Sequence, residues 1–280
     1  MTRCFQIKVK LLSNKKIKDN YLHCIFNAPQ IAKDARPGQF VNIRISDTLD
    51  PLLRRPLSIH VVRGSKIEIL YEVVGKSTRV LSEKKPGEYL DIIGPLGKGF
   101  DLESKPRVSI LIGGGMGVAP LVFLAKKLKT KKLALIGAKT KNHIHCEKEF
   151  KEFGCGVKVS TDDGSEGFKG KVTDLLKKIL LTTYNLQLTT IYACGPRPML
   201  KEIALISREQ NIPAQISLEE HMACGIGACL GCAVETIHGY KRICKDGPVF
   251  DANKIIFYGV GKYPYRTKKS KTVSYTTETS

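Results

Sequence analysis

The feature that most constrains this chain is a group of four cysteines near its carboxyl end. Cys224, Cys229 and Cys232 stand in a C-x4-C-x2-C pattern, and Cys244 follows after eleven further residues. The segment around them is rich in glycine and shows little hydrophobic periodicity, so a packed core does not explain its shape. Four thiolates held at one small centre would fix that shape. Because no export signal is evident, metal or redox use is expected rather than a disulfide framework.

The spacing of the first three cysteines is typical of plant-type 2Fe-2S sites, where the longer loop wraps around the inorganic core. Gly225, Gly227 and Gly231 are expected to give this loop left-handed backbone angles and to direct N–H groups toward the sulfides. Zinc and unligated cysteines are the alternatives, but zinc sites usually carry two C-x2-C pairs and this segment has one. The cysteines without ligand spacing are interpreted as small hydrophobic or surface residues: Cys4, Cys24, Cys146 and Cys155.

Length and composition describe a globular protein of more than one unit. The 280 residues exceed the usual single-domain size, and 42% hydrophobic with 26% charged residues excludes collagen-like and disordered chains. A net charge of +20 would suit nucleic acid or an acidic partner. The lysines are scattered, however, and do not form one stripe with interleaved aromatic residues. We therefore expect a solvated lysine-rich surface and no nucleic-acid partner.

Two segments bear on location. Lys8 and Lys10 split the hydrophobic residues near the N-terminus, so we do not expect an export signal. A cytoplasmic location is expected instead. Residues 108–125 carry no charge and approach the length that spans a membrane. Their glycines and Pro120 fit a strand, a turn and a helix start better than a lipid-facing helix, so no membrane partner is expected.

The order of short segments predicts an α+β multi-domain fold. Residues 1–102 are β-rich, with turns between short apolar runs, and are expected to form an antiparallel β-barrel. Residues 103–213 alternate strand and helix patterns, which indicates a central α/β nucleotide-binding domain with a parallel sheet. Residues 214–250 are expected to form a small iron-sulfur loop domain. Residues 251–280 form an extension that is expected to be flexible at its end.

The segments behind this division are short apolar runs and helical repeats. Strands are expected at 40–45, 57–62, 67–74, 108–112, 133–139 and 189–195, and helices at 121–128, 173–180 and 199–210.

A glycine turn, GGGMGVAP, follows a predicted strand and opens a predicted helix, where backbone N–H groups and the helix dipole can receive a pyrophosphate. Gly113, Gly115 and then Val118 break the strict G-x-G-x-x-G pattern, so a plain packing turn remains an alternative. In YACGPRPML, Cys194 lies at the end of another strand and a helix begins at Pro198. Both strand ends would face one crevice, the place where open α/β sheets bind ligands.

Two turns of the first domain carry polar groups. LLRRPLSIH places Arg55 and Ser58 three residues apart, and VVGKSTRVL places Gly75, Ser77 and Thr78 on a later turn. Taken alone, such an arginine is more often a solvated charge, and such a serine an ordinary strand hydroxyl.

Taken together and in order, these motifs resemble the electron-transfer subunits of the dihydroorotate dehydrogenase B family, within the ferredoxin-reductase superfamily. The resemblance covers nearly the whole chain, to about Phe250. RRPLSI, YEVVGKSTRVL, GPLGKGF, GGGMGVAPL, TDDGS and CGPRPML are shared across the superfamily. EEHMACGIGACLGC and its CKDGPVF ending discriminate the family.

This resemblance implies an FAD-binding barrel, an NAD-binding domain and a 2Fe-2S loop. It places Arg55 at the FAD pyrophosphate, which suits a guanidinium fork, and Ser58 near the flavin N5. It assigns FAD to Arg55, Pro56, Leu57, Ser58, Leu70, Tyr71, Glu72, Gly75, Ser77 and Thr78. It assigns NAD to Gly113, Gly114, Gly115, Gly117, Cys194 and Gly195, and the cluster to Cys224, Cys229, Cys232 and Cys244.

Nucleotide choice stays open in the sequence. Lys139 and Lys141 follow a predicted strand at a place where an acidic residue would favour an unphosphorylated ribose, so NADP remains an alternative to NAD.

The resemblance also implies an activity and a partner in pyrimidine biosynthesis. An FMN-containing catalytic subunit would oxidise dihydroorotate, and this chain would pass the electrons through its cluster and FAD to NAD+. No residue of this chain is then expected to act as a catalytic acid or base. A two-plus-two heterotetramer is implied, with the backbone around Cys224 to Cys232 as the docking patch. The alternatives are an NAD(P)H reductase subunit for ferredoxin, sulfur or hydrogenase systems, and a zinc-stabilised nucleic-acid-binding adaptor.

Overall fold

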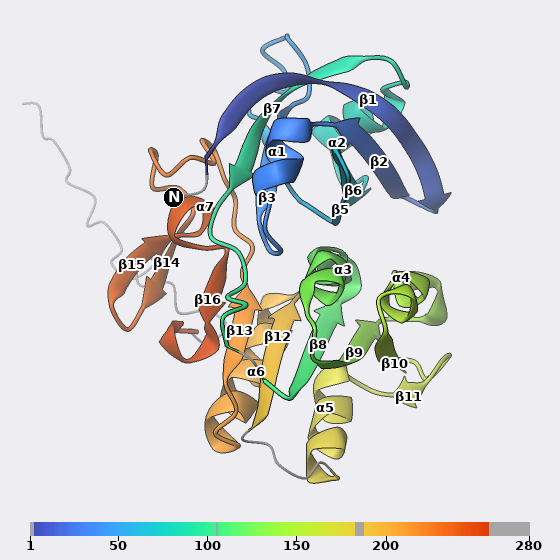
Figure 1. The fold of residues 1–280 in the computed structure, drawn as a ribbon, viewed down its shortest axis with the longest axis vertical. Helices are drawn as coiled ribbons and strands as arrows, with labels where there is room; N and C mark the ends of the chain where they lie inside the picture. Colours follow the sequence, from blue (N-terminus) through green and yellow to red (C-terminus); the bar gives the residue numbers. More distant parts are fainter. Residues whose placement is uncertain (1–2, 105, 183–187, 258–280) are drawn as a thin grey trace, which may run out of the picture.

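The structure is a computed structural model that describes residues 3–104, 106–182 and 188–257. Two seven-stranded sheets follow one another along the chain, and a two-stranded hairpin lies beside the second sheet (Figure 1). This arrangement confirms the α+β class that the order of segments predicts.

The first sheet curls into an antiparallel barrel. Its strand order is β4-β3-β7-β1-β2-β6-β5, and every neighbouring pair is antiparallel. Alternation explains the long first strand, because Val9 and Leu11 are buried while Lys8 and Lys10 face solvent. The barrel elements are β1 (Phe5–Lys18), β2 (Tyr21–Asn27), α1 (Pro29–Asp34), β3 (Phe40–Arg44), β4 (Arg55–Ser58), β5 (Val61–Arg63), β6 (Lys66–Glu72), α2 (Lys76–Glu83) and β7 (Tyr89–Leu96).

The second sheet is parallel except at one edge. Its order is β11-β10-β9-β8-β12-β13-β16, and only β16 runs antiparallel to its neighbour. Its strands are β8 (Val108–Gly114), β9 (Lys131–Ala138), β10 (Cys155–Thr161), β11 (Phe168–Lys169), β12 (Thr189–Cys194), β13 (Ala214–Ser217) and β16 (Val249–Asp251). The uncharged run at 108–125 is therefore divided between β8 and the helix that follows. No helix in the described part of the chain has the length and apolar character needed to cross a membrane.

Helices cover both faces of this second sheet. The helix that follows β8 is buried from Val118 to Ala125, because it lies between the sheet and the barrel and is part of one hydrophobic core with both (Figure 1). The helices at Val172–Leu181 and Arg197–Glu209 pack on the opposite face of the sheet, where their buried residues belong to a second hydrophobic core. The helical segments are η1 (Gly115–Gly117), α3 (Val118–Lys127), η2 (Lys141–His143), α4 (Glu147–Glu152), α5 (Val172–Leu181), α6 (Arg197–Glu209) and η4 (Ala252–Lys254).

The cysteine segment forms a third, small unit. It contains β14 (Ala233–Thr236), β15 (Gly239–Arg242) and α7 (Ile243–Asp246). The second sheet continues past the boundary expected after residue 213, because β13 and β16 both lie in it. Residues to 257 are described and Ala252 and Ile255 are buried, whereas the expected flexible end at 258–280 lies outside the described residues.

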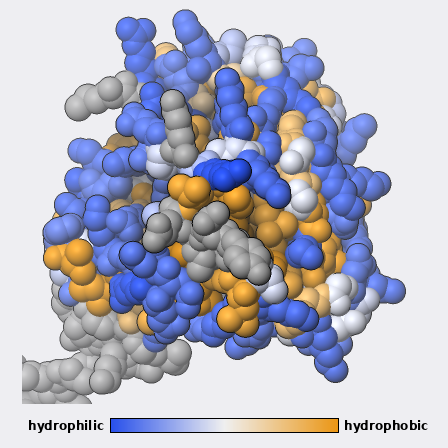
Figure 2. Space-filling model, turned by 60° about the horizontal axis from the view of Figure 1, so that its bottom comes forward, coloured by the Kyte–Doolittle hydropathy of each residue, from blue (hydrophilic) through white to orange (hydrophobic). Residues whose placement is uncertain are grey.

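The end of the second domain that lies away from the barrel has a mixed surface (Figure 2). Figure 2 shows hydrophilic residues dispersed around the rim of this face and hydrophobic residues nearer its middle.

Candidate functional site: a cysteine centre beside a nucleotide cleft

The four cysteines lie as two pairs. Cys224 and Cys229 are in side-chain contact in the first loop, and the backbone N–H of Cys229 donates to the Cys224 sulfur at 3.4 Å. Cys232 and Cys244 form the second pair, in which the Cys244 N–H donates to the Cys232 sulfur at 3.4 Å. The second pair is buried, and Cys229 is exposed. The centre therefore has one enclosed side and one side open to solvent.

A β-hairpin explains the eleven-residue gap before the fourth cysteine. Ala233 on β14 pairs with Arg242 on β15, so the residues flanking the hairpin meet at its open end. There the Ile243 N–H donates to the Cys232 carbonyl oxygen at 3.0 Å, and Cys244 follows in α7. The eleven residues between Cys232 and Cys244 are therefore the length of chain that forms the hairpin and brings Cys244 back beside Cys232.

The glycines of the loop only partly match the expectation. Gly225 and Gly227 have φ values of +70° and +86°, as predicted. The prediction is wrong for Gly231, because Leu230 takes the left-handed conformation instead, with φ 60°. A side chain at Gly225 would also lie 2.4 Å from the Asn42 amide nitrogen, so close packing on the barrel requires glycine there.

The backbone prepares one thiol for ligation. Partial burial opposes ionisation of Cys224, but N–H groups of the loop, including that of Ala228 at 3.3 Å, lower its pKa to about 6. Burial and the neighbouring Cys232 raise the pKa of Cys244 to about 12. Metal binding must therefore displace a proton from Cys244 but not from Cys224 at neutral pH.

The paired sulfurs fit a two-iron centre better than one zinc ion. A tetrahedral zinc site with bonds of about 2.3 Å needs all four sulfurs roughly 3.8 Å apart. Among the described residues, no three of these four sulfurs lie within 4.8 Å of one another, so the sulfurs are too far apart to surround one zinc ion. Two thiolates for each of two irons match the observed pairs. The residues present therefore fit a 2Fe-2S cluster.

A cleft of about 770 Å³ opens between the barrel and the carboxyl ends of the parallel strands. Its floor comes from the ends of β8, β9 and β12, which is where open α/β sheets bind nucleotides. Among the predicted residues it brings together Glu72, Gly114, Gly115, Gly117 and Gly195. Gly113 and Cys194 do not line it, and the Cys194 side chain is buried beneath it.

The glycine turn has two distinct requirements. A side chain at Gly117 would lie 2.2 Å from the Cys194 carbonyl oxygen, and one at Gly113 would lie 2.4 Å from Val118. Gly115 has φ +54° and nothing within 4 Å of a would-be side chain. The turn thus needs glycine for close packing against β12, and it also leaves exposed backbone at the cleft. It is therefore both a packing turn and a turn that can receive a pyrophosphate.

The predicted flavin residues follow one edge of the barrel. Arg55, Pro56, Leu57 and Ser58 form β4, which pairs with β3. One terminal nitrogen of the Arg55 guanidinium donates to the Leu53 and Arg54 carbonyl oxygens, which leaves the rest of the fork available among the described residues.

The second flavin segment is the start of α2. Its N-cap is Gly75, and Ser77 is buried in its first turn. The Thr78 hydroxyl accepts from the N–H groups of Val74 at 3.0 Å and Gly75 at 3.1 Å, which fixes the loop. Free N–H groups at this helix start suit phosphate oxygens.

Tyr71 departs from the expectation that its side chain lines the cofactor. Its ring is 2% exposed inside the barrel, and its hydroxyl donates to Asn14 Oδ1 at 3.1 Å. Leu70 and Glu72 point to the opposite side of β6 because side chains alternate along a strand. Only the backbone of Tyr71 can therefore contact a group on that side.

Two acidic residues of the cleft were missed by the sequence reasoning. Asp162 follows β10 and Glu219 follows β13, and both line the cleft. The signal for Asp162 was its place directly after a strand of alternating residues, in TDDGS. Desolvation raises the pKa of the Glu219 carboxyl.

Comparisons with known proteins agree with this arrangement. Residues 219–256 match the iron-sulfur cluster binding domain of dihydroorotate dehydrogenase B, and residues 111–204 match an oxidoreductase NAD-binding domain. The dihydroorotate dehydrogenase B (NAD(+)) electron transfer subunit of Desulforamulus reducens is 42% identical over 266 residues, covering 92% of this chain and 100% of the relative. This chain belongs to the dihydroorotate dehydrogenase B electron transfer subunit family.

Solved structures show the same architecture. An NADH-dependent reduced ferredoxin-NADP oxidoreductase studied for flavin-based electron bifurcation matches with a TM-score of 0.79 and 33% identity, covering 89% of each chain. The ferredoxin NADP+ reductase of Neisseria gonorrhoeae, solved with FAD and NADP, matches with a TM-score of 0.62 and 16% identity, covering 73% of this chain and 91% of that one. The second likeness shows the fold alone. Family membership favours electron transfer over the zinc-stabilised adaptor.

Proposed function

We propose that this chain carries electrons from an FMN-containing dihydroorotate dehydrogenase catalytic subunit to NAD+ in pyrimidine biosynthesis. The observation that carries this proposal is the paired arrangement of four thiols in a segment whose first loop is hydrogen-bonded to the barrel. When bound, FAD supplies exchange between the electron pairs of a nicotinamide and the single electrons of a 2Fe-2S cluster. The chain itself binds, spaces and shields these groups and supplies no acid or base for dihydroorotate oxidation.

The barrel edge is proposed to hold FAD. The Arg55 guanidinium and the start of α2 at Gly75, Ser77 and Thr78 offer positive charge and N–H groups to the pyrophosphate. Ser58 ends β4 opposite Phe40 and would contact the flavin ring through its hydroxyl. The backbone of Leu70 to Glu72 would complete the site from β6.

The interdomain cleft is proposed to hold NAD. Its glycine turn presents backbone to the pyrophosphate at Gly114, Gly115 and Gly117, and Gly195 lies directly beside this turn. Asp162 stands beside Lys139 at the end where an adenosine ribose would lie. A carboxylate there accepts ribose hydroxyls and repels a 2′-phosphate, which supports NAD rather than NADP.

The cysteine loop is proposed as the docking surface for the catalytic subunit. Ile226 is 53% exposed and Leu230 is 62% exposed on this loop, beside the exposed Cys229. Exposed apolar residues of this kind favour a protein interface and place the partner close to the cluster. A two-plus-two heterotetramer in the cytoplasm, where free thiols stay reduced, is the proposed assembly.

The ferredoxin-linked reductase is the second candidate, because a structure of that kind shares 33% identity and nearly the full length. The two functions differ in the partner and not in the cofactors.

The deciding experiment is co-production of this chain with an FMN-containing dihydroorotate dehydrogenase catalytic subunit. We expect the two chains to co-elute and to form one NADH per orotate, whereas the catalytic subunit alone should form orotate only with an artificial acceptor. Absence of co-elution, together with NAD(P)H-dependent reduction of ferredoxin, would favour the second candidate.

A further inference from the structure

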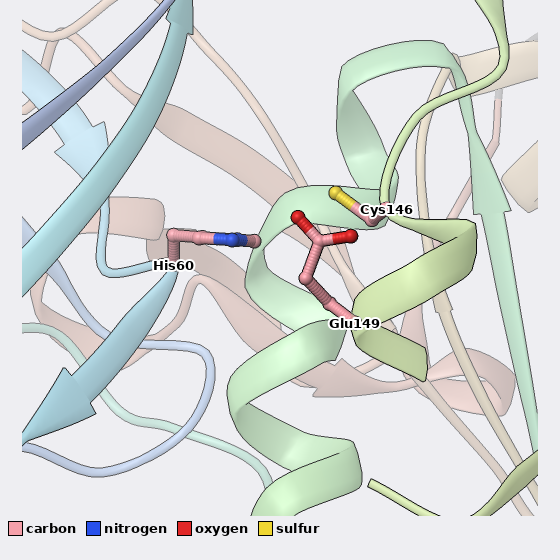
Figure 3. Close-up of side chains that lie close together, drawn as sticks. All are labelled: His60, Cys146 and Glu149. Atoms are coloured by element: carbon pink, nitrogen blue, oxygen red, sulfur yellow. The ribbon is translucent and has the colours of Figure 1, made fainter. Parts of the chain in front are cut away.

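A second group of potential metal ligands lies on the opposite side of α3 from the cysteine loop, between the barrel and the nucleotide-binding domain. His60 lies between β4 and β5 of the barrel, whereas Cys146 and Glu149 belong to the start of α4. Figure 3 shows the His60 ring pointing toward the Glu149 carboxylate, with the Cys146 sulfur beside that carboxylate. One ligand atom from each residue lies within 4.8 Å of the other two. Two domains therefore contribute to one cluster.

The His60 ring is oriented as a metal ligand would be. Its Nδ1 lies 2.8 Å from the Ala119 carbonyl oxygen, which can only accept, so Nδ1 carries the hydrogen. Nε2 is then left with a free lone pair. A backbone carbonyl that fixes the tautomer in this way is the usual support of a metal-bound histidine. The ring is buried, and this burial lowers the pKa of His60 and keeps the imidazole neutral.

The Cys146 thiol is held in place by its backbone. Cys146 caps α4 with φ 63°, an uncommon conformation for a residue other than glycine, and its side chain is 7% exposed. Glu149 follows one helical turn later, so both side chains lie on the same side of the helix start. Burial raises the pKa of the Cys146 thiol, which therefore keeps its proton until a metal replaces it.

We propose that His60, Cys146 and Glu149 bind one Zn2+ ion that joins the barrel to the nucleotide-binding domain. One nitrogen, one sulfur and one oxygen are all ordinary zinc ligands, and three protein ligands leave the fourth position to water. The ion would bind as Zn2+ without a change of oxidation state, and the thiol proton would pass to solvent as the Zn–S bond forms. The carboxylate and the thiolate together balance the charge of the ion.

The surrounding charges are already paired. Arg63 contacts Glu68 at 3.2 Å and Glu152 at 3.1 Å, and His23 contacts Glu68 at 2.9 Å. Among the described residues, the Glu149 carboxylate forms no ion pair, so it is available to the ion.

The test uses the full chain loaded with FAD and two irons, so that zinc cannot occupy the four cluster thiols. After dialysis against a mild chelator and incubation with zinc, we expect one zinc per chain. Zinc-edge X-ray absorption should show one sulfur at about 2.3 Å, with the remaining ligands nitrogen or oxygen. Absence of bound zinc, or a zinc spectrum with four sulfurs, would overturn the proposal.

Variants separate this site from general loss of folding. Cys146→Ser and Glu149→Gln should each weaken zinc binding by about tenfold or more while flavin and iron contents stay unchanged. Cys155→Ser is the matched control, because Cys155 is also 7% exposed but lies outside the site, on β10. Zinc should raise the melting temperature of the parent chain and of Cys155→Ser, but not of the two site variants. Equal zinc binding in Cys146→Ser, Glu149→Gln and Cys155→Ser would contradict the assignment.

Discussion

The Asn42 side chain donates a 3.1 Å hydrogen bond to the carbonyl oxygen of Cys224 and so connects the barrel to the cysteine loop. Asn42 lies on β3 opposite Pro56 of β4 and is 1% exposed. The first cluster cysteine is therefore one side chain away from the strand proposed to carry the flavin. This contact fixes the position of the cysteine loop relative to the barrel, and with it the distance between the sites proposed for the cluster and for the flavin. No pattern in the sequence predicts it.

Replacing Asn42 should loosen the cluster loop. Asn42→Ala leaves the partly buried Cys224 carbonyl oxygen without its donor, which costs about 1 kcal/mol. We expect faster loss of iron in air and a lower iron content per chain, measured by metal analysis. Gln39→Ala is the control, because Gln39 is equally buried and donates to Gly97 instead. It should lower the melting temperature without changing iron retention, and equal iron loss in both variants would contradict the prediction.

A methyl group at Gly117 should disturb nucleotide binding. In Gly117→Ala the added carbon would meet the Cys194 carbonyl oxygen at 2.2 Å, so the turn must move away from β12. We expect KM for NADH to rise by at least about tenfold, with flavin content unchanged. Gly156→Ala is the matched control, since its nearest neighbour would lie at 3.6 Å. A normal KM in Gly117→Ala would show that the turn does not position the nucleotide.

Asp162 should set the preference for NAD. Removing its charge in Asp162→Ser is expected to raise the ratio of NADPH to NADH activity by about tenfold, or ~1.4 kcal/mol. Asp163→Ser removes the same charge from a neighbouring residue that does not line the cleft and should leave the ratio unchanged. An unchanged ratio in Asp162→Ser would place the ribose elsewhere.

Glu219 should give the chain a pH-dependent stability. Its pKa is raised above 4.5 in the folded chain, so the native state binds more protons than the unfolded state between these two values. The stabilising effect of the protonated carboxyl is full below the unfolded pKa and is lost as pH rises through the folded pKa. The melting temperature of the parent chain should therefore fall relative to Glu219→Gln as pH rises through this window. A constant difference between the two would refute the shift.

Much of the fold is predictable from local patterns. The buried run VSILI forms β8, and the helical repeat from Leu121 to Leu128 lies in α3 and its C-cap. Both were predictable because their hydrophobic patterns lie within one short segment of chain. The first two strands were not assigned, since lysines interrupt β1. The prediction of a turn at VVGKSTRVL is wrong for Ser77 and Thr78, which lie in α2; this helix begins at Lys76, directly after Gly75.

The site was predictable in its residues but not in its geometry. The C-x4-C-x2-C spacing indicates a cluster, yet the pairing of Cys232 with Cys244 depends on the hairpin between them. Motif matching also cannot tell which face of β6 Tyr71 occupies, because a strand's register is set by its neighbours. The contact between Asn42 and Cys224 joins residues 182 positions apart, which no local pattern encodes.

The most direct test of the account is an anaerobic titration with NADH, followed by absorbance and by electron paramagnetic resonance, of the parent chain and of Cys229→Ser. Three electrons per parent chain should be taken up, two by FAD and one by the cluster, with a reduced 2Fe-2S signal. Cys229→Ser should keep its FAD and its reduction by NADH, yet lose transfer to the catalytic subunit, while Cys4→Ser behaves as the parent. A parent chain that takes up only two electrons and contains no iron would contradict the account.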